Sequence, residues 1–335
     1  MVKFDLNDIS LYPSEISDIS SRNDIDIYLK NKNLPIYTAP MDTVIDIDNI
    51  DVFNINKINM CLPRYLNNNN DNYFHSYGLD DVIKLFESDN LPKKLLIDVA
   101  NGNMFKLWDM TKKIKEKYGN DIEIMVGNIA NPKTYKKYCE INVDYIRCGI
   151  GGGSVCTTSA NVSINYPMGS LISECFSISK DFKNPSKIIA DGGFKNYSDI
   201  IKALALGANG VMIGNILSKS LESCGSFYIF EENKYKKINN DKALLFFNDK
   251  IPIYKKYRGM STKDVQKSWN KTNLKTAEGI SIYNKVEYTL SGWIQNFEDY
   301  LKSAMSYCNS SNLDEFIGND NWIMITQNAY NRFNK

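Results

Sequence analysis

A cysteine and two threonines follow a glycine-rich run in the middle of the chain. The run reads Gly149-Ile150-Gly151-Gly152-Gly153-Ser154-Val155-Cys156-Thr157-Thr158. Glycines let backbone amides approach a phosphate or a cation closely, and a thiol held beside them is a candidate nucleophile. A glycine-rich turn followed by a half-buried structural cysteine would have the same sequence. The run alone leaves both interpretations open.

Two later turns favour the functional interpretation. They are Ala190-Asp191-Gly192-Gly193 and Ile213-Gly214-Asn215, and each follows an apolar segment. Glycines ahead of a helix offer backbone amides and the helix N-terminus to an anion, and a carboxylate at Asp191 is suited to receive ribose hydroxyls. Asp-Gly-Gly by itself is a sequence common in ordinary turns that bind no ligand. Three such segments together predict a nucleotide site.

The elements that position these turns follow from the apolar pattern. Short apolar runs that end in glycine or polar turns alternate with helical patterns. The expected strands are 34–40, 55–62, 73–77, 94–100, 123–129, 144–150, 187–192 and 210–214. The expected helices between them are 80–87, 106–118, 132–141, 169–179 and 197–206. Eight strands that alternate with helices predict an α/β fold, a (β/α)8 TIM barrel; the third strand is weak, so seven strands is the alternative.

The chain is expected to be one domain, residues 1–335, because no Pro/Gly/Ser-rich linker divides it. From about residue 227 the pattern changes to a C-terminal extension, with an active-site flap at roughly 227–285. Residues 227–229 and 251–254 are expected to form hairpin strands. An amphipathic helix is expected at 292–308, where Trp293, Phe297, Leu301 and Met305 recur at helical spacing.

Composition excludes several classes of protein. The formal net charge of +1 argues against a dedicated nucleic-acid binder, which usually carries a basic excess. The seven cysteines form no CxxC pair, so neither a zinc site nor a disulfide framework is expected. The N-terminus lacks the apolar core of a signal peptide, and no apolar run is long enough to span a membrane. We therefore expect a soluble, cytoplasmic protein with reduced thiols and a small-molecule substrate.

The chain resembles the IMP dehydrogenase/GMP reductase family over nearly its whole length. The resemblance lies in residues 34–44, in the 149–158 loop, in Ile189-Ala190-Asp191-Gly192-Gly193, in Tyr257-Arg258-Gly259-Met260-Ser261 and in Glu278-Gly279. It implies a (β/α)8 barrel, a homotetramer, and chemistry in which Cys156 attacks C2 of GMP or IMP while a hydride passes to or from a nicotinamide at that carbon.

The resemblance also implies roles for the other site residues. Asp191 would hold the ribose hydroxyls of the substrate. The residues expected to contact the substrate are Ser154, Asp191, Gly192, Gly193, Gly214, Asn215, Tyr257, Gly259, Met260 and Ser261. The residues expected to contact the nicotinamide cofactor are Asp98, Asn101, Gly102, Asn128 and Arg64. Main-chain oxygens at Gly151 and Gly153 resemble the family's site for a monovalent cation such as K⁺.

Two features resemble the reductase branch. No CBS-type regulatory insertion follows Pro63-Arg64-Tyr65, and only a short segment separates Met260 from Glu278, without the Arg-Tyr pair that a dehydrogenase uses to activate water. Thr158 and Glu278 match the pair that handles protons on the leaving amine. The expectation is therefore a GMP reductase, in which NADPH and GMP give IMP and ammonia through a thioimidate on Cys156.

Two alternatives stay open. Ala39-Pro40-Met41, Ile189-Ala190-Asp191 and Lys256-Tyr257-Arg258 look more like the dehydrogenase branch, so one alternative is an IMP dehydrogenase that lacks the CBS domain and oxidises IMP to XMP with NAD. The other is a non-catalytic nucleotide-binding barrel. The lone histidine, His75, excludes a histidine-rich metal site and is expected to be structural.

Overall fold

Eight parallel strands form the centre of the molecule. The computed structural model describes residues 2–66, 70–260, 262 and 279–333. Within them the large sheet runs in the order β2-β9-β8-β7-β6-β5-β4-β3, and every neighbouring pair is parallel. The strands are β2 (Ile36–Thr38), β3 (Cys61–Leu62), β4 (Phe74–Tyr77), β5 (Lys94–Asp98), β6 (Glu123–Ile129), β7 (Tyr145–Cys148), β8 (Lys187–Asp191) and β9 (Gly210–Ile213).

A threonine side chain helps to close this sheet into a barrel. Between β2 and β3 one backbone bridge joins Tyr37 to Asn59. Beyond it the Thr38 hydroxyl accepts from the amide of Cys61 at 2.9 Å and donates to the carbonyl of Cys61 at 3.1 Å. The weak third strand is present as β4, so the eight-stranded prediction is confirmed and the seven-stranded alternative is wrong.

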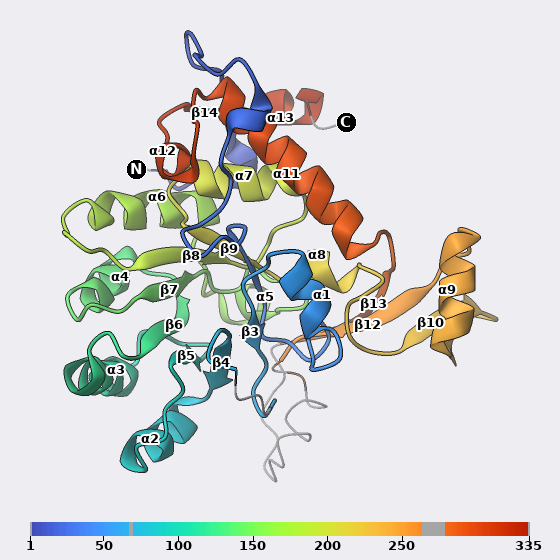
Figure 1. The fold of residues 1–335 in the computed structure, drawn as a ribbon, viewed down its shortest axis with the longest axis horizontal. Helices are drawn as coiled ribbons and strands as arrows, with labels where there is room; N and C mark the ends of the chain where they lie inside the picture. The colour runs from blue at the N-terminus through green and yellow to red at the C-terminus, as the bar shows by residue number, and fades with distance from the viewer. Residues whose placement is uncertain (1, 67–69, 261, 263–278, 334–335) are drawn as a thin grey trace.

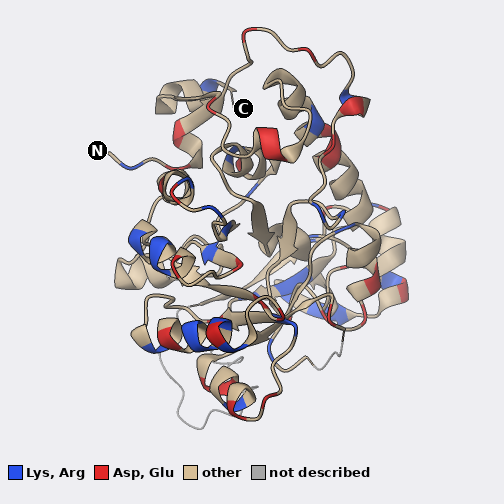
Figure 2. Ribbon diagram, turned by 60° about the vertical axis from the view of Figure 1, so that its left-hand side comes forward, with Lys and Arg blue, Asp and Glu red and all other residues tan. Residues whose placement is uncertain are grey.

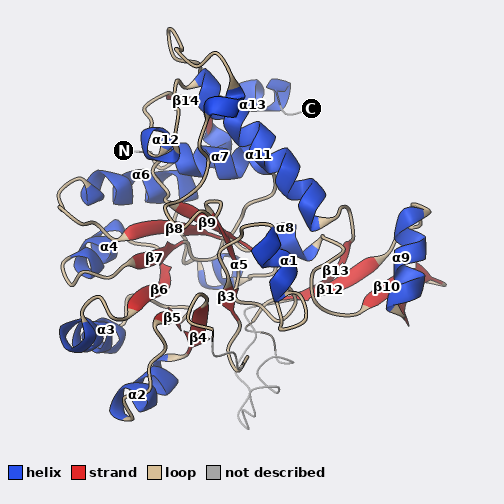
Figure 3. Cartoon of the chain, viewed as in Figure 1, coloured by secondary structure: helices blue, strands red, loops and turns tan. Residues whose placement is uncertain are grey.

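Helices cover the outside of the barrel (Figure 1, Figure 3). They are α1 (Ile50–Ile55), α2 (Leu79–Glu87), α3 (Phe105–Tyr118), α4 (Pro132–Cys139), α6 (Met168–Ser179), α7 (Tyr197–Ala205) and α8 (Asn215–Ser218). The short helix α5 (Thr158–Val162) instead continues the loop that follows β7. Asn131 caps α4 by accepting from the amide of Lys133, and Pro132 occupies the first turn, where a missing N–H costs nothing. The strand expected at 55–62 is wrong at its start, because Ile55 ends α1 and Lys57 turns the chain with φ of 55°.

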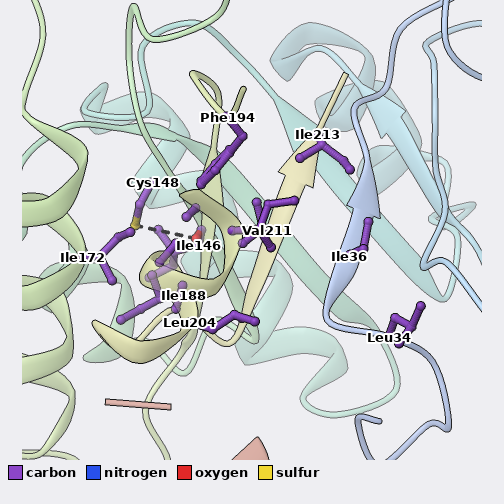
Figure 4. Close-up of a cluster of buried hydrophobic side chains, with 14 of the residues drawn as sticks. Leu34, Ile36, Ile146, Cys148, Ile172, Ile188, Phe194, Leu204, Val211 and Ile213 are labelled. Atoms are coloured by element: carbon purple, nitrogen blue, oxygen red, sulfur yellow. Dashed lines mark hydrogen bonds between the residues drawn. The ribbon is translucent and has the colours of Figure 1, made fainter. Parts of the chain in front are cut away.

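Alternation along each strand divides the core into two layers. In β5, Leu96 joins the cluster that fills the barrel, whereas Leu95 and Ile97 join the cluster between strands and helices. Figure 4 shows part of that outer cluster, with Ile146 and Cys148 of β7 beside Ile172 of α6. Inside the barrel, burial raises the pKa of the Cys61 thiol to about 12, so this cysteine is unreactive.

A small antiparallel sheet lies to one side of the barrel (Figure 1). Its order is β11-β10-β12-β13, and α9 (Asn240–Asn248) contacts β10. The strands are β10 (Phe227–Glu231), β11 (Lys234–Ile238), β12 (Tyr254–Arg258) and β13 (Ser281–Lys285). The expected strands at 227–229 and 251–254 are present in part, because β10 pairs antiparallel with β12 and Tyr228 is opposite Tyr254. They are not consecutive, since Glu232 and Asn233, with φ of 51° and 60°, make a two-residue turn that joins β10 to β11 in a hairpin.

The two ends of the chain meet on the other side of the barrel. Strand β1 (Ile9–Leu11) pairs antiparallel with β14 (Trp322–Met324). The predicted amphipathic helix is present as α11 (Leu290–Tyr307), followed by α12 (Leu313–Phe316) and α13 (Gln327–Phe333), while two short 3-10 helices lie near the N-terminus at Leu6–Asp8 and Arg22–Asp24. Figure 2 shows acidic and basic residues interspersed over the outer helices. No helix in the described part of the chain has the length and apolar character to cross a bilayer.

Candidate active site

Cys156 lies on the loop that follows β7, at the C-terminal end of the barrel. It is the one cysteine of the seven that is not buried. Its thiol lies 3.3 Å from the hydroxyl of Thr158, and its amide donates to the carbonyl of Gly153 at 2.9 Å. The loop is held from the other side, because Cys156 bridges to Gly279 and Val155 accepts from the amide of Ile280 at 3.0 Å. The thiol is therefore both accessible and fixed.

The glycines of this loop allow it to touch the loop after β8. A Cβ on Gly149, where φ is 138°, would lie 2.2 Å from the carbonyl oxygen of Asp191. A Cβ on Gly193, where φ is 87°, would lie 3.2 Å from the carbonyl oxygen of Gly152. Larger residues would separate the two loops. The predicted nucleophile and the predicted phosphate-binding glycines are thus brought together.

The third predicted turn reaches the same place through Tyr257. A Cβ on Gly214 would lie 2.6 Å from the Tyr257 hydroxyl oxygen, and that hydroxyl also interacts with the Ser154 side chain. Tyr257 is buried, and burial raises its pKa, so it stays a neutral donor. Asn215 is fixed by the Asn284 amide, which donates to its side-chain oxygen at 2.7 Å. Residues predicted to bind one phosphate therefore converge from three loops and β12.

Arg147, which the sequence did not point to, links Asp191, the predicted ribose ligand, to Asp98, a predicted cofactor ligand. One guanidinium nitrogen lies 2.7 Å from Asp98 Oδ1 and the other lies 2.8 Å from Asp191 Oδ2. Arg147 is only 6% exposed. Arg64 lies on the far side of Asp98, with Nε 3.2 Å from Oδ2. Burial alone would raise the pKa of Asp98, but the charges of Arg147 and Arg64 outweigh it and lower that pKa below its ordinary value.

Asp191 is oriented by these contacts. Its Oδ2 accepts from Arg147 and from the Asn128 amide, which lies 2.6 Å away and also donates to the carbonyl of Gly149 at 2.8 Å. No donor among the described residues makes a hydrogen bond to Oδ1, since all three side-chain donors contact Oδ2. One carboxylate oxygen is thus fixed by the protein while the other is available for a ribose hydroxyl.

The remaining predicted cofactor residues form a neighbouring turn. The amide of Gly102 donates to the carbonyl of Asn128 at 2.7 Å, and a Cβ on Gly102 would lie 2.6 Å from that same oxygen. Asn101 caps this turn by accepting from the amide of Asn103. Asp98, Asn101, Gly102, Asn128 and Arg64 therefore lie along the ends of β5 and β6, although Arg64 is engaged with Asp98. Their role toward a nicotinamide cofactor stays a prediction.

The carbonyls predicted to hold a monovalent cation already accept hydrogen bonds. Gly151 accepts from the Ser159 hydroxyl and Gly153 accepts from the amide of Cys156, both at 2.9 Å. No group of three or more His, Cys, Asp or Glu side chains suited to a metal occurs among the residues described. Two carbonyls that already accept hydrogen bonds do not by themselves form a cation site. The monovalent cation therefore also stays a prediction.

Two predicted residues, Ser261 and Glu278, lie outside the described residues. Their neighbours Gly259 and Met260 are described, and a Cβ on Gly259 would lie 2.9 Å from the carbonyl oxygen of Val155. The end of β12 therefore reaches the Cys156 loop, as expected for residues that meet the base.

A cavity of about 670 Å³ lies at the opposite end of the barrel, beside the starts of β6, β7 and β8. Its charged groups are paired, with Lys115 3.0 Å from Asp144 and the Tyr145 hydroxyl 2.8 Å from Glu123. Reactive groups of TIM barrels gather at the C-terminal ends of the strands. Among the described residues, the predicted site residues around Cys156 lie at that C-terminal end, and none of them lines this cavity.

Comparison with known proteins identifies the family of this chain. Residues 89–333 match the model of the family described as IMP dehydrogenase / GMP reductase domain. Inosine-5'-monophosphate dehydrogenase of Chlorobaculum parvum is 31% identical over 230 residues, which are 69% of this chain and 44% of that protein. The enzyme of the same name from Cryptosporidium parvum is 32% identical over 241 residues, 69% of this chain and 54% of that protein. That of Staphylococcus haemolyticus is 39% identical over 142 residues, 42% of this chain and 28% of that protein. The chain thus spans about half, or less, of the length of these relatives.

Proposed function

Because the chain belongs to the IMP dehydrogenase / GMP reductase family, we propose that it is an oxidoreductase acting at C2 of a purine nucleotide, and that its reaction is the oxidation of IMP. The observation that carries the proposal is the position of Cys156. It is the accessible thiol of the chain, and it lies on a loop that touches the loop of Asp191, Gly192 and Gly193. A purine nucleotide with its ribose at Asp191 and its phosphate at these glycines would place its base beside this thiol.

The residues supply the steps of a covalent mechanism. The Cys156 sulfur forms a bond to C2, and the hydrogen of C2 leaves with its electron pair. A nicotinamide cofactor, when bound, accepts that hydride. Water then attacks C2 and the C–S bond breaks, which returns the thiol and gives XMP. Thr158, with its hydroxyl 3.3 Å from the sulfur, is placed to exchange a proton with groups at C2.

The direction of the reaction is supported by the relatives. Those named above, at 31–39% identity, carry the name of the dehydrogenase. Two segments of the site also resemble the dehydrogenase branch of the family. Ile189-Ala190-Asp191 forms the end of β8 and Lys256-Tyr257-Arg258 forms the end of β12, so both belong to the site.

GMP reductase is the second candidate, and a specific feature of the sequence favours it. The segment between Met260 and Gly279 is short and contains no Arg-Tyr pair, so a dehydrogenase of this chain would need another group to activate water. In the reductase direction the C2–N bond of GMP breaks, ammonia leaves, and hydride from NADPH resolves the bond to Cys156. That route requires no water.

One set of assays separates the candidates. Purified protein is mixed with IMP and NAD⁺ or NADP⁺, and with GMP and NADH or NADPH, and absorbance at 340 nm is followed while products are separated by chromatography. A rise with IMP, together with XMP, is the expected result. A fall with GMP, together with IMP and ammonia, would assign the reductase. No change in any mixture, with nucleotide still bound, would identify a non-catalytic barrel. Repeating the active mixture in potassium and lithium buffers tests the cation prediction.

Substitution of the nucleophile tests the mechanism. We expect Cys156→Ala to reduce turnover by about a thousandfold or more, since the covalent route is lost, while nucleotide binding measured by calorimetry remains. Cys308→Ser is the matched control, because this buried thiol lies at the end of α11 and should leave turnover unchanged. Iodoacetamide should label Cys156 first, and IMP or GMP should protect it. Turnover close to wild type in Cys156→Ala would refute the covalent mechanism, whichever direction the reaction takes.

A further inference from the structure

A serine hydroxyl closes the loop that carries Cys156. The hydroxyl of Ser159 donates to the carbonyl of Gly151 at 2.9 Å. A Cβ on Gly151, where φ is 80°, would lie 1.9 Å from the Ser159 oxygen, so only a glycine fits beside this hydroxyl. Ser159 directly follows Thr158 in the first turn of α5. The bond therefore joins the glycine run before Cys156 to the helix that follows it.

Helix α5 is not held in place by burial of its side chains. None of its residues is buried, and Thr157 before it makes no side-chain capping hydrogen bond. A helix of five residues is not stable by itself in water, because its first turn is costly to form. The Ser159 bond thus helps to fix α5, and with it the Thr158 hydroxyl that lies 3.3 Å from the Cys156 thiol.

The bonded carbonyls of this loop are those predicted to hold a monovalent cation. A protein binds such an ion with several carbonyl oxygens that together replace its hydration shell. Gly151 instead receives the hydroxyl hydrogen of Ser159, and Gly153 receives the amide hydrogen of Cys156, both with donor–acceptor distances of 2.9 Å. Each hydrogen carries a positive partial charge and points at an oxygen that the cation would need. The residues present therefore do not fit the cation.

The charge of the segment agrees with this conclusion. Residues 149–165 contain no Asp or Glu, so no carboxylate of the loop or of α5 balances a positive ion. The Ser159 hydroxyl needs no such balance, because it is neutral while it directs a positive hydrogen at the Gly151 oxygen. A neutral donor can therefore do at Gly151 what an ion would do, which is to hold the glycine run against the start of α5.

We propose that the Ser159 hydroxyl takes the place of a monovalent cation in this protein, and that Ser159 is a positioning residue for Cys156 and Thr158. We assign it no contact with the nucleotide, since it acts by fixing Gly151 and α5 on either side of the thiol. The protein should then function without K⁺. The kinetic part of this inference rests on the proposed function, whereas its structural part concerns the loop alone and applies to either direction of the reaction.

The cation is tested by exchanging choline chloride for KCl at constant ionic strength. We expect the melting temperature measured by circular dichroism, with IMP or GMP present, to stay the same, because an ion that binds only the folded protein would raise it. Turnover of the wild type should also stay the same. A rise in either quantity that saturates with KCl would overturn the proposal. The melting curve requires no turnover, so it decides the cation even if the protein converts neither nucleotide, which is the result that would refute the proposed function.

Variants of the serine test its role as a positioning residue. We expect Ser159→Ala to lower kcat about tenfold or more with a smaller change in KM, because the thiol and the Thr158 hydroxyl lose their alignment. Ser159→Thr keeps the hydroxyl and should stay close to wild type. Ser163→Ala is the matched control, since it removes an exposed hydroxyl at the end of the same helix. Equal kcat in Ser159→Ala and Ser163→Ala would overturn the proposal. Equal losses in Ser159→Ala and Ser159→Thr would overturn it too, because packing at this position and not the hydroxyl would then be responsible.

Discussion

At the residue scale, the buried Arg147 is the main finding that the sequence pattern hides. It stands in β7 between apolar neighbours, where a strand in a barrel normally buries uncharged side chains. A charge is tolerated there because Asp98 and Asp191 both lie within 2.8 Å of its guanidinium nitrogens. A Cβ on Gly127 of β6 would lie 2.4 Å from the Cβ of Arg147, so the neighbouring strand leaves room for it. Arg147 thus fixes the carboxylate to which we assign the ribose.

Replacing this arginine should leave buried carboxylates without a partner. We expect Arg147→Met to lower the free energy of unfolding by about 3–5 kcal/mol, the usual cost of breaking a buried ion pair from one side. Urea unfolding followed by circular dichroism measures it. Adding Asp191→Asn should recover part of the loss, because it removes one of the two charges left unpaired. A loss below about 1 kcal/mol in the single variant would show that Arg147 does not stabilise the site in this way.

The same variant should change how stability depends on pH. The pKa of Asp98 is lower in the folded protein than its ordinary value, so this group stabilises the fold above that ordinary value, and the stabilisation is lost as pH falls toward the folded pKa. Without Arg147, burial should raise the folded pKa. The acid loss of stability should then begin at higher pH in Arg147→Met than in wild type.

At the scale of elements, the site consists of strand ends that approach closely because glycines allow it. Gly149, Gly193 and Gly214 stand where three loops meet one another and Tyr257. Each glycine is explained by a specific neighbour within contact distance, and the backbone amides exposed by that approach are what an anion would bind. The same glycines therefore allow the loops to pack closely and expose the backbone amides that would bind a phosphate.

Filling the space at Gly214 should weaken substrate binding. We expect Gly214→Ala to raise KM for the nucleotide about tenfold or more with a smaller effect on kcat, because the added methyl would displace the Tyr257 hydroxyl that lies 2.6 Å from its position. Steady-state kinetics measures both constants. Gly225→Ala is the control, since φ of 97° there strains an alanine while no atom lies within 4 Å of the new methyl. Equal KM values in the two variants would contradict the assignment.

Strand β12 carries a second buried charge, at Lys255. Its ammonium donates to the carbonyls of Leu221 and Ser223, and burial lowers its pKa from 10.5 to about 8. The unfolded chain therefore binds this proton more readily between these two pKa values, so this group makes the protein more stable as pH rises from about 8 to 10.5.

Comparison with a variant isolates this effect. We expect the free energy of unfolding of wild type to rise relative to that of Lys255→Met by up to about 3 kcal/mol over that range, which is the shift converted at 1.36 kcal/mol per unit. Denaturant unfolding at several pH values measures it. Parallel curves for the two proteins would show that Lys255 titrates at its ordinary pKa.

At the scale of the whole molecule, the C-terminal residues are packed onto the barrel through Phe176 of α6. Its ring lies between two glycines, because a Cβ on Gly207 would lie 2.2 Å from it and a Cβ on Gly318 would lie 1.9 Å from it. The amide of Gly318 also donates to the carbonyl of Leu204 at the end of α7. Together with the pairing of β1 and β14, this contact ties both ends of the chain to one side of the barrel.

An alanine at position 318 should disturb this contact strongly. The ring cannot move away from Gly318 without meeting Gly207, and φ of 75° also disfavours a side chain there. We expect Gly318→Ala to lower the free energy of unfolding by about 2–4 kcal/mol, from overpacking and backbone strain together. Phe176→Leu in the same chain should recover part of it, because the shorter side chain makes room. Additive effects in this double-mutant cycle would contradict the proposed contact.

The sequence by itself determined the barrel and the candidate nucleophile Cys156 on the loop after β7. Apolar runs alternating with helical patterns placed β6 at its observed bounds and most other strands close to theirs, because a strand buried on both faces is a continuous apolar run in the sequence. The exception is β3, which was expected from residue 55 and begins at Cys61. The glycines around Cys156 were recognisable for the same reason, as local chemistry. The pairing of β1 with β14 and the ion pairs of Arg147 were decided only by the tertiary structure. Each depends on residues distant in the chain, and the sequence of one segment identifies neither its pairing partner nor the group that neutralises its buried charge.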